Sequence, residues 1–198
     1  MKNNLSEKLS KIFNPNVIVS FTPFKDGKKQ NYQITLIEED NYNKENSFTE
    51  ITLQGFNDIY FAIKFDKFPF LHGRKDSIEN FEDSLLIAEN IRKSCDYIIW
   101  AKFEEHKIIL LVELKSRNND FVSEKFKSSK AFIEYLKSLL NEFYNFSTED
   151  YKIIAFLIND KANKSISQVN GYFRKGFKEI KSPKLYYIKS DFEKILAK

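Results

Sequence analysis

The sequence predicts an α/β (α+β) fold, in which a mixed β-sheet is flanked by helices and preceded by an antiparallel β-rich region. Three observations support this prediction. The chain has 198 residues, of which 42% are hydrophobic and 20 are Phe, enough for the core of a single domain. Up to about residue 70, β-type segments follow one another. From residue 77 the order becomes helix, strand, strand, helix, strand, loop, strand, helix.

The N-terminal part, residues 1–75, is expected to be a β-rich elaboration of this domain. Residues 4–13 predict a short helix, because Leu5, Leu9 and Phe13 recur at helical spacing. Asp26-Gly27 is a turn signal that predicts a hairpin. The expected strands cover residues 17–22, 32–37, 48–53 and 59–65, and the polar stretch 38–47 is expected to form a loop.

Residues 76–198 are expected to form the core. Ser77 can cap an amphipathic helix over residues 77–93, and Asn119 or Asp120 can cap a second one that runs to about Phe143. The apolar stripe of the second helix comprises Phe126, Phe132, Ile133, Leu136, Leu139, Leu140 and Phe143. Strands are expected over 96–103, 108–115, 151–158 and 185–188, with a turn at 104–107, a polar stretch up to residue 182, and a terminal helix after Ser190.

Composition excludes several classes of protein. The single cysteine, Cys95, rules out an intrachain disulfide and a multi-cysteine metal cluster, and fits a reducing cytoplasm. No window approaches roughly 18 uncharged apolar residues, so no membrane span is expected. The two histidines lack partners at metal-site or triad spacing, and the five glycines form no phosphate-binding loop. A net charge of +4 permits a nucleic-acid partner without requiring one.

Charged residues at the ends of two apolar strands carry the chemical signal. Asp96 opens the first strand, and Glu113-Leu114-Lys115 closes the second. If the turn pairs Phe103 with Ile108, Asp96 lies opposite Lys115 and on the same face as Glu113, roughly 7–8 Å away on the diagonal. Two carboxylates and the Leu114 carbonyl are oxygen ligands suited to Mg²⁺ or Mn²⁺. Lys115 would then position or deprotonate a water or stabilise developing negative charge. The alternative is an exposed Asp–Lys ion pair that contributes little.

This stretch resembles the PD-(D/E)XK nuclease superfamily, whose fold is restriction-endonuclease-like. Cys95-Asp96 stands where the family often has Pro-Asp, and Glu113-Leu114-Lys115 matches the (D/E)XK element. The resemblance covers about 80 residues. It implies a core of helix, three-strand meander, helix and strand, a Mg²⁺ or Mn²⁺ cofactor, and an assisting carboxylate on the preceding helix. Glu82 is the preferred candidate for that carboxylate, with Glu89 as the other; both can instead be ordinary rim residues.

Two groups of basic residues are candidates for contacting nucleic-acid phosphates. The first lies on the helix after the Glu-x-Lys element: Lys125, Lys127 and Lys130. The second lies in the basic and aromatic stretch 170–178: Arg174, Lys175 and Lys178. The alternatives are a solvated lysine face and an exposed loop with buried aromatic residues.

The strand-end acids and the resemblance together predict a cytoplasmic, metal-dependent nuclease that hydrolyses phosphodiester bonds, with DNA as the expected substrate, in a restriction or antiphage defence setting. The resemblance also implies a possible homodimer or a protein partner bound through the N-terminal β region. The competing hypothesis is a non-catalytic nucleic-acid-binding or assembly module on the same fold.

Overall fold

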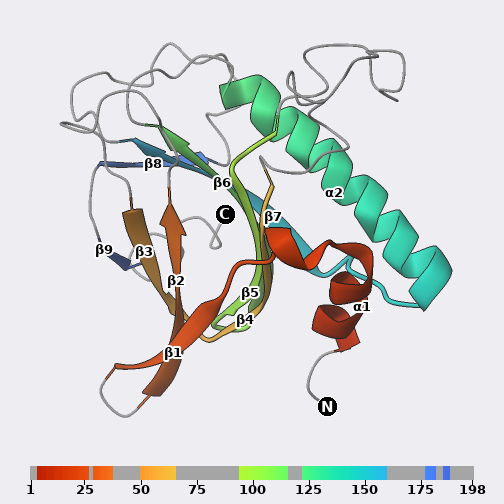
Figure 1. The fold of residues 1–198 in the computed structure, drawn as a ribbon, viewed down its shortest axis with the longest axis horizontal. Coiled ribbons are helices and arrows are strands. Elements are labelled where there is room, and N and C mark those ends of the chain that lie inside the picture. The colour runs from red at the N-terminus through yellow and green to blue at the C-terminus, as the bar shows by residue number, and fades with distance from the viewer. Residues whose placement is uncertain are drawn as a thin grey trace.

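Two β-sheets and two helices form three layers in the computed structural model of the chain (Figure 1). The structure describes residues 4–26, 29–37, 50–65, 94–115, 122–159, 177–181 and 185–187. Helices α1 (Asn4–Ile12) and α2 (Val122–Tyr144) cover one face of a five-stranded sheet, and a four-stranded sheet packs on its other face. The mixed α+β class predicted from the sequence is confirmed.

The strands of the two sheets follow different patterns. The four-stranded sheet has the order β1-β2-β3-β9, and the five-stranded sheet has the order β4-β5-β6-β7-β8. Strands β4, β5 and β6 form an antiparallel meander, and β7 and β8 add to it in parallel. The bounds are β1 (Phe21–Asp26), β2 (Lys29–Ile37), β3 (Glu50–Phe56), β4 (Asp58–Lys64), β5 (Tyr97–Phe103), β6 (His106–Lys115), β7 (Tyr151–Asn159), β8 (Phe177–Lys181) and β9 (Leu185–Tyr187).

The N-terminal region largely follows its sequence pattern. The predicted stripe of α1 is buried, with Leu5, Leu9 and Phe13 in the core. The β1–β2 hairpin forms at the Asp26-Gly27 signal, since Asp26 pairs with Lys29. Strand β1 begins later than residue 17, because a short 3-10 turn occupies Pro15–Val17.

The two sheets exchange strands across the expected division at residue 75. Strand β4 lies before that division but pairs with β5 in the five-stranded sheet. Strand β9 lies after it and pairs in parallel with β3. The N-terminal and C-terminal parts of the sequence are therefore interleaved in the sheets.

The turn between β5 and β6 corrects the expected strand register. Phe103 pairs with His106 rather than with Ile108, so the turn consists of Glu104 and Glu105 alone. Glu104 has a φ of 52°, as a tight two-residue hairpin turn requires. Its N–H donates a hydrogen bond to the side-chain oxygen of Asn57. Neither residue is a usual turn former, which is why the sequence did not reveal so short a turn.

Helix α2 connects β6 to the parallel strand β7 and packs on the sheet between them. Its buried positions are Val122, Phe126, Ser129, Ile133, Leu136 and Leu140. Phe143, expected in this stripe, is 76% exposed. Strand β8 lies within the stretch expected to be a polar loop, and includes Lys178, paired with Phe156 of β7. Parallel pairing with a buried strand therefore overrides the polar pattern here.

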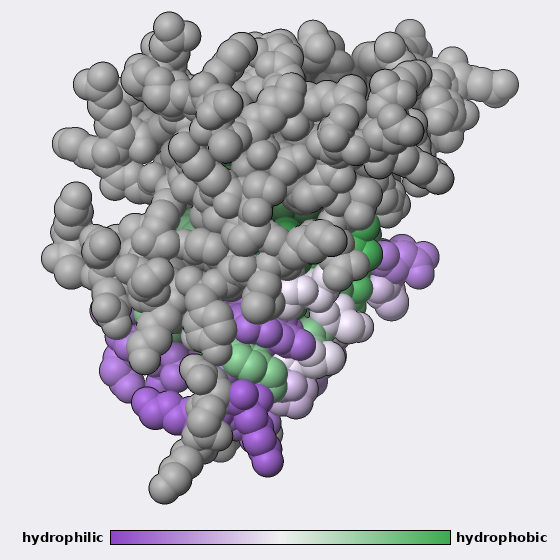
Figure 2. All heavy atoms as spheres, turned by 90° about the vertical axis from the view of Figure 1, so that its left-hand side faces the viewer, coloured by the Kyte–Doolittle hydropathy of each residue, from purple (hydrophilic) through white to green (hydrophobic). Residues whose placement is uncertain are grey.

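The five-stranded sheet is covered on both faces, as its nearly continuous apolar strands require. One face packs on the helices and the other on the inner face of the four-stranded sheet. Figure 2 views the molecule from the side of the four-stranded sheet, where the described side chains are mostly hydrophilic. Hydrogen-bonded polar pairs alternate there with the core residues of β2 and β3: Thr35 with Thr52, and Gln33 with Gln54. No helix in the described ranges is long and apolar enough to cross a bilayer.

Candidate functional site

The acidic residues Asp96 and Glu113 meet at the end of the β5–β6 hairpin that lies away from its turn. The observed register pairs Tyr97 with Val112, and one further step places Asp96 opposite Glu113 instead of opposite Lys115. This displacement by two residues leaves the predicted face unchanged, because side chains alternate with a period of two. Both carboxylates therefore lie on the side of the sheet that packs on α2.

A backbone hydrogen bond orients the Asp96 carboxylate. Its Oδ2 atom accepts a hydrogen bond of 2.6 Å from the N–H of Leu114. In an extended strand the N–H and C=O of one residue point toward the same neighbouring strand, so the Leu114 carbonyl leaves β6 on the Asp96 side as well. The predicted oxygen donors, Asp96, Glu113 and the Leu114 carbonyl, thus gather at one strand end.

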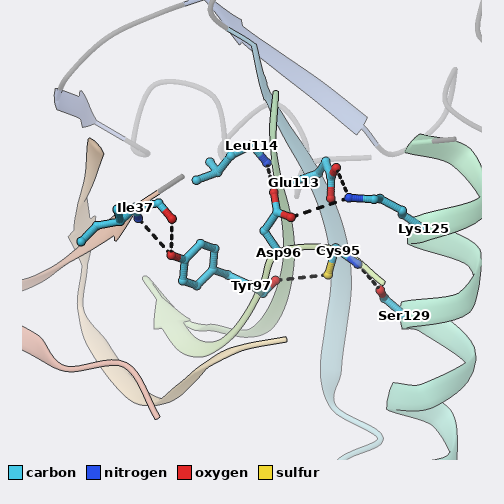
Figure 3. A network of polar contacts seen from close by, with 8 residues as sticks. All are labelled: Ile37, Cys95, Asp96, Tyr97, Glu113, Leu114, Lys125 and Ser129. Atoms are coloured by element: carbon cyan, nitrogen blue, oxygen red, sulfur yellow. Dashed lines mark hydrogen bonds and ion pairs between the residues drawn. The ribbon is translucent and has the colours of Figure 1, made fainter. Parts of the chain in front are cut away.

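A lysine from α2 reaches both carboxylates (Figure 3). The Nζ atom of Lys125 lies 2.6 Å from Oε1 of Glu113 and 3.7 Å from Oδ1 of Asp96. The Glu113 side chain is 0% exposed, and that of Lys125 is 21% exposed. A charge buried to this extent is tolerated only when it is paired and hydrogen-bonded, so the ammonium is a main stabiliser of the acidic pair.

The electrostatics of the cluster keep Lys125 positively charged. Burial by itself would lower the pKa of Lys125, but the negative charges of Glu113 and Asp96 and the hydrogen bond to Glu113 outweigh it. The net effect raises the pKa of Lys125 above its usual value. Lys125 is therefore an ammonium at neutral pH in this arrangement and is unsuited to act there as a general base.

The segment that carries Asp96 is held from both sides. The N–H of Cys95 donates a 2.9 Å hydrogen bond to Oγ of Ser129 on α2, and the Cys95 thiol donates to the carbonyl of Tyr97. On the opposite side, the Tyr97 hydroxyl accepts from the N–H of Ile37 and donates to its carbonyl. Burial raises the pKa of the Cys95 thiol, which therefore stays protonated and has a structural role.

The predicted site residues have different outcomes. Asp96 and Glu113 are brought together, and Lys115 is the last residue of β6, although its side chain lies outside the described part. Lys127 and Lys130 are exposed on α2, whereas Lys125, predicted to contact nucleic acid with them, contacts the carboxylates. Four predicted or alternative residues lie outside the described residues: Glu82, Glu89, Arg174 and Lys175. The side chain of Lys178 is likewise outside the described part.

Sequence reasoning missed two contributions from α2. It grouped Lys125 with the exposed lysines and did not identify Ser129 as a partner of Cys95. A signal existed, because Lys125 lies three residues after Val122 and four before Ser129, which places it on the buried side of the helix. A lysine on that side near the start of the helix faces the end of the preceding strand.

The cluster meets part of the requirements of a divalent-cation site. Its donors are oxygens, as Mg²⁺ and Mn²⁺ prefer, and they already enclose a cation, the Lys125 ammonium. Among the described residues, no group of three or more His, Cys, Asp and Glu side chains gathers at one point. A metal would therefore be held by Asp96, Glu113 and the Leu114 carbonyl, with further positions filled by water or substrate, as is usual for Mg²⁺.

Comparisons with known proteins add no relative to this picture. The chain matches no family model, no curated protein and no solved structure. Its function is therefore inferred from the geometry of the acidic pair and from the sequence resemblance.

Proposed function

We propose that this protein is a metal-dependent nuclease that hydrolyses phosphodiester bonds in DNA, with Asp96 and Glu113 as its metal ligands. The observation that carries the proposal is the convergence of these two carboxylates, from adjacent strands, on a single cation at a covered strand end. Polar groups at the end of a strand buried on both faces are typical of active sites in α/β proteins.

Each residue of the cluster has a proposed task. A divalent cation, when bound, would supply a Lewis acid that polarises the phosphoryl oxygens. Asp96, oriented by the Leu114 N–H, and Glu113, buried beside it, would hold this cation through their carboxylate oxygens. Lys115 is proposed to position the attacking water or to stabilise negative charge on the phosphorus centre. Glu82 is proposed to assist from the preceding segment.

The order of elements supports the same proposal. The resemblance implies a helix, a three-strand meander, a helix and a strand, and the chain contains the meander β4-β5-β6, α2 and β7 in that order. Residues 77–93, expected to form the first helix, lie outside the described residues. Asp96 directly precedes the second meander strand, and Glu113 lies near the end of the third, as the resemblance requires. This agreement supports the order of the elements only, because one fold can carry many functions and the activity must be argued from the residues of the site.

The exposed lysines of α2 are proposed to hold the nucleic-acid backbone. Lys127 and Lys130 lie three residues apart on the helix and are both exposed. Phosphate contacts of this kind position the substrate without reading its sequence. Replacing both lysines by Gln is expected to weaken DNA binding and to reduce the salt dependence of log K by about 2, about one for each phosphate that is no longer neutralised.

A second candidate function has an observation of its own. Lys125 already neutralises the acidic pair, as it would in a purely structural ion-pair cluster. This favours a non-catalytic nucleic-acid-binding or assembly module in which Asp96, Glu113 and Lys125 hold α2 against the sheet. The two functions differ in whether the cluster binds a divalent cation.

Metal-dependent cleavage tests the proposal directly. Supercoiled plasmid, linear DNA and RNA are incubated with the purified chain and Mg²⁺ or Mn²⁺, and the products are followed on gels. The variants are Asp96→Asn and Glu113→Gln, which remove charge with little change in shape. The matched control is Glu105→Gln, because this exposed acid lies in the turn at the opposite end of the same hairpin.

Cleavage by the wild type and the control but not by the two site variants is the expected result. Equal metal-dependent cleavage by all four proteins would refute the assignment of the site. DNA binding without cleavage by the wild type, and without Mn²⁺ binding in calorimetry, would favour the non-catalytic module.

A further inference from the structure

The Lys125 ammonium lies at the position where the proposed function needs a metal ion. Its Nζ atom is 2.6 Å from one Glu113 oxygen and 3.7 Å from one Asp96 oxygen. A Mg²⁺ ion bound by the same oxygens would lie about 2.0–2.1 Å from each of them. The ammonium and a metal ion would therefore depend on the same pair of carboxylates.

Two cations cannot share this pair at low cost. An ammonium left in place would lie within a few ångströms of a divalent cation, and the Glu113 end of the cluster is fully buried, so the repulsion is weakly screened. The carboxylates provide two negative charges, which one divalent cation balances by itself. The binding of a metal therefore requires the ammonium to leave.

Lys125 has a route out of the cluster. Its side chain is 21% exposed, whereas that of Glu113 is 0% exposed, so the lysine forms the solvent side of the ion pair. Its ammonium is carried on a flexible stem of four carbons, so it can move to solvent without movement of α2. The helix itself stays anchored, because Val122, Phe126 and Ser129 are buried on both sides of Lys125 in the sequence.

We propose that Lys125 and a divalent cation compete for the Asp96–Glu113 pair, so that Lys125 holds the ligands together before the metal binds and is displaced when it does. This inference rests on the proposed function, because it assumes that the pair is a metal site. It assigns Lys125 a positioning role in place of the phosphate contact predicted from the sequence.

Competition has a measurable consequence for metal affinity. Removing the ammonium removes a charged hydrogen bond that the metal must otherwise break, and bonds of that kind are equivalent to a factor of about 10–100 in affinity. Mn²⁺ is titrated into the full chain by calorimetry, in the absence of DNA. The variants are Lys125→Met, Glu113→Gln and, as a matched control from the exposed side of α2, Lys130→Met.

Lys125→Met is expected to bind Mn²⁺ about 10–100 times more tightly than the wild type, with Lys130→Met unchanged and Glu113→Gln much weaker. If Lys125→Met binds no more tightly than the wild type while Glu113→Gln still loses binding, the competition is refuted and the metal site stands. If Glu113→Gln binds Mn²⁺ as well as the wild type, or none of the proteins binds it, the metal site and the competition are both refuted.

A folding measurement covers the case in which Lys125→Met is unfolded in metal-free buffer. Mn²⁺ is then titrated into the unfolded Lys125→Met variant in refolding buffer, and its folding is followed by far-UV circular dichroism. Recovery of the folded signal is expected, because Mn²⁺ replaces the missing positive charge. No recovery at millimolar Mn²⁺ would contradict the proposal, since the metal could not take the place of the ammonium.

Discussion

Replacing Lys125 by Met in metal-free buffer is expected to destabilise the protein severely. The substitution keeps an apolar stem of similar length but removes the ammonium that contacts the fully buried Glu113 at 2.6 Å. Removing one partner of a buried ion pair costs about 3–5 kcal/mol. Because Lys125 is 21% exposed and water reaches its end of the pair, the lower limit of about 3 kcal/mol applies. In a chain of this length, that corresponds to a decrease in Tm of about 6–12 °C.

Lys107→Met is the matched control for this prediction. Lys107 pairs with Asp150 at 2.5 Å, nearly the same distance, but the two side chains are 45% and 57% exposed. Exposed ion pairs contribute about 0–1 kcal/mol, so its Tm should change by no more than about 4 °C. The two lysine substitutions therefore differ mainly in the burial of the partner that they leave behind.

Thermal unfolding followed by circular dichroism in EDTA measures both variants, and urea unfolding provides the free energies. A double variant, Lys125→Met with Glu113→Gln, should recover most of the lost stability, because it removes the buried charge along with its partner. A Tm for Lys125→Met as close to the wild type as that of Lys107→Met would refute the reasoning, since it would mean that Glu113 does not depend on the ammonium.

Three further predictions test the surroundings of the site. Asp96→Ala should be less stable than Asp96→Asn by about 1–2 kcal/mol in urea unfolding, because only Asn retains an oxygen for the Leu114 N–H; equal stabilities would contradict this. Tyr97→Phe should cost about 1 kcal/mol, since it removes both hydrogen bonds to Ile37, and an unchanged Tm would show that water replaces them fully. The Tm should be flat between pH 7 and about pH 9 and should fall at higher pH, because three groups hold their protons more tightly in the folded state than in the unfolded one. In the pH range where the native state binds more protons than the unfolded state, stability decreases as the pH rises. A Tm that rises above about pH 9 would contradict this sign. Burial raises the pKa of Cys95 and that of Tyr151. The carboxylates of Glu113 and Asp96 raise the pKa of Lys125 despite its burial.

The fold could be predicted where local patterns agree with the tertiary environment. Helix α1 and the strand cores of β2, β5, β6 and β7 follow their apolar spacing closely, because each buries a face that the sequence marks. The pattern failed at Phe143, which is exposed, whereas the next residue of the helix, Tyr144, packs against the core. It failed again at β8, where hydrogen bonds to β7 support a strand whose own composition is polar.

The candidate site was predictable in its acids but not in its cation. Asp96 and Glu113 were identified because charge at the end of an apolar strand needs an explanation, and their common face survived an error in register of two residues. The register was wrongly expected, because Glu113 and not Lys115 lies opposite Asp96. The contact of Lys125 with both acids was not predicted. Cross-strand reasoning sees only the two strands and has no access to the helix that packs over them.

The sequence by itself determined the mixed α+β class and the presence of two acids at a buried strand end, because period-two and period-3.6 patterns act over a few residues. Only the tertiary structure decided which strands share a sheet and which positive charge meets the acids. Strand β4 joins β5, and Lys125 crosses from α2 to Glu113. The physical reason is that these contacts join segments that are distant in the sequence, and their pairing depends on packing and charge compensation across the whole domain. Packing and charge compensation of this kind produce no periodic pattern in the sequence of either segment.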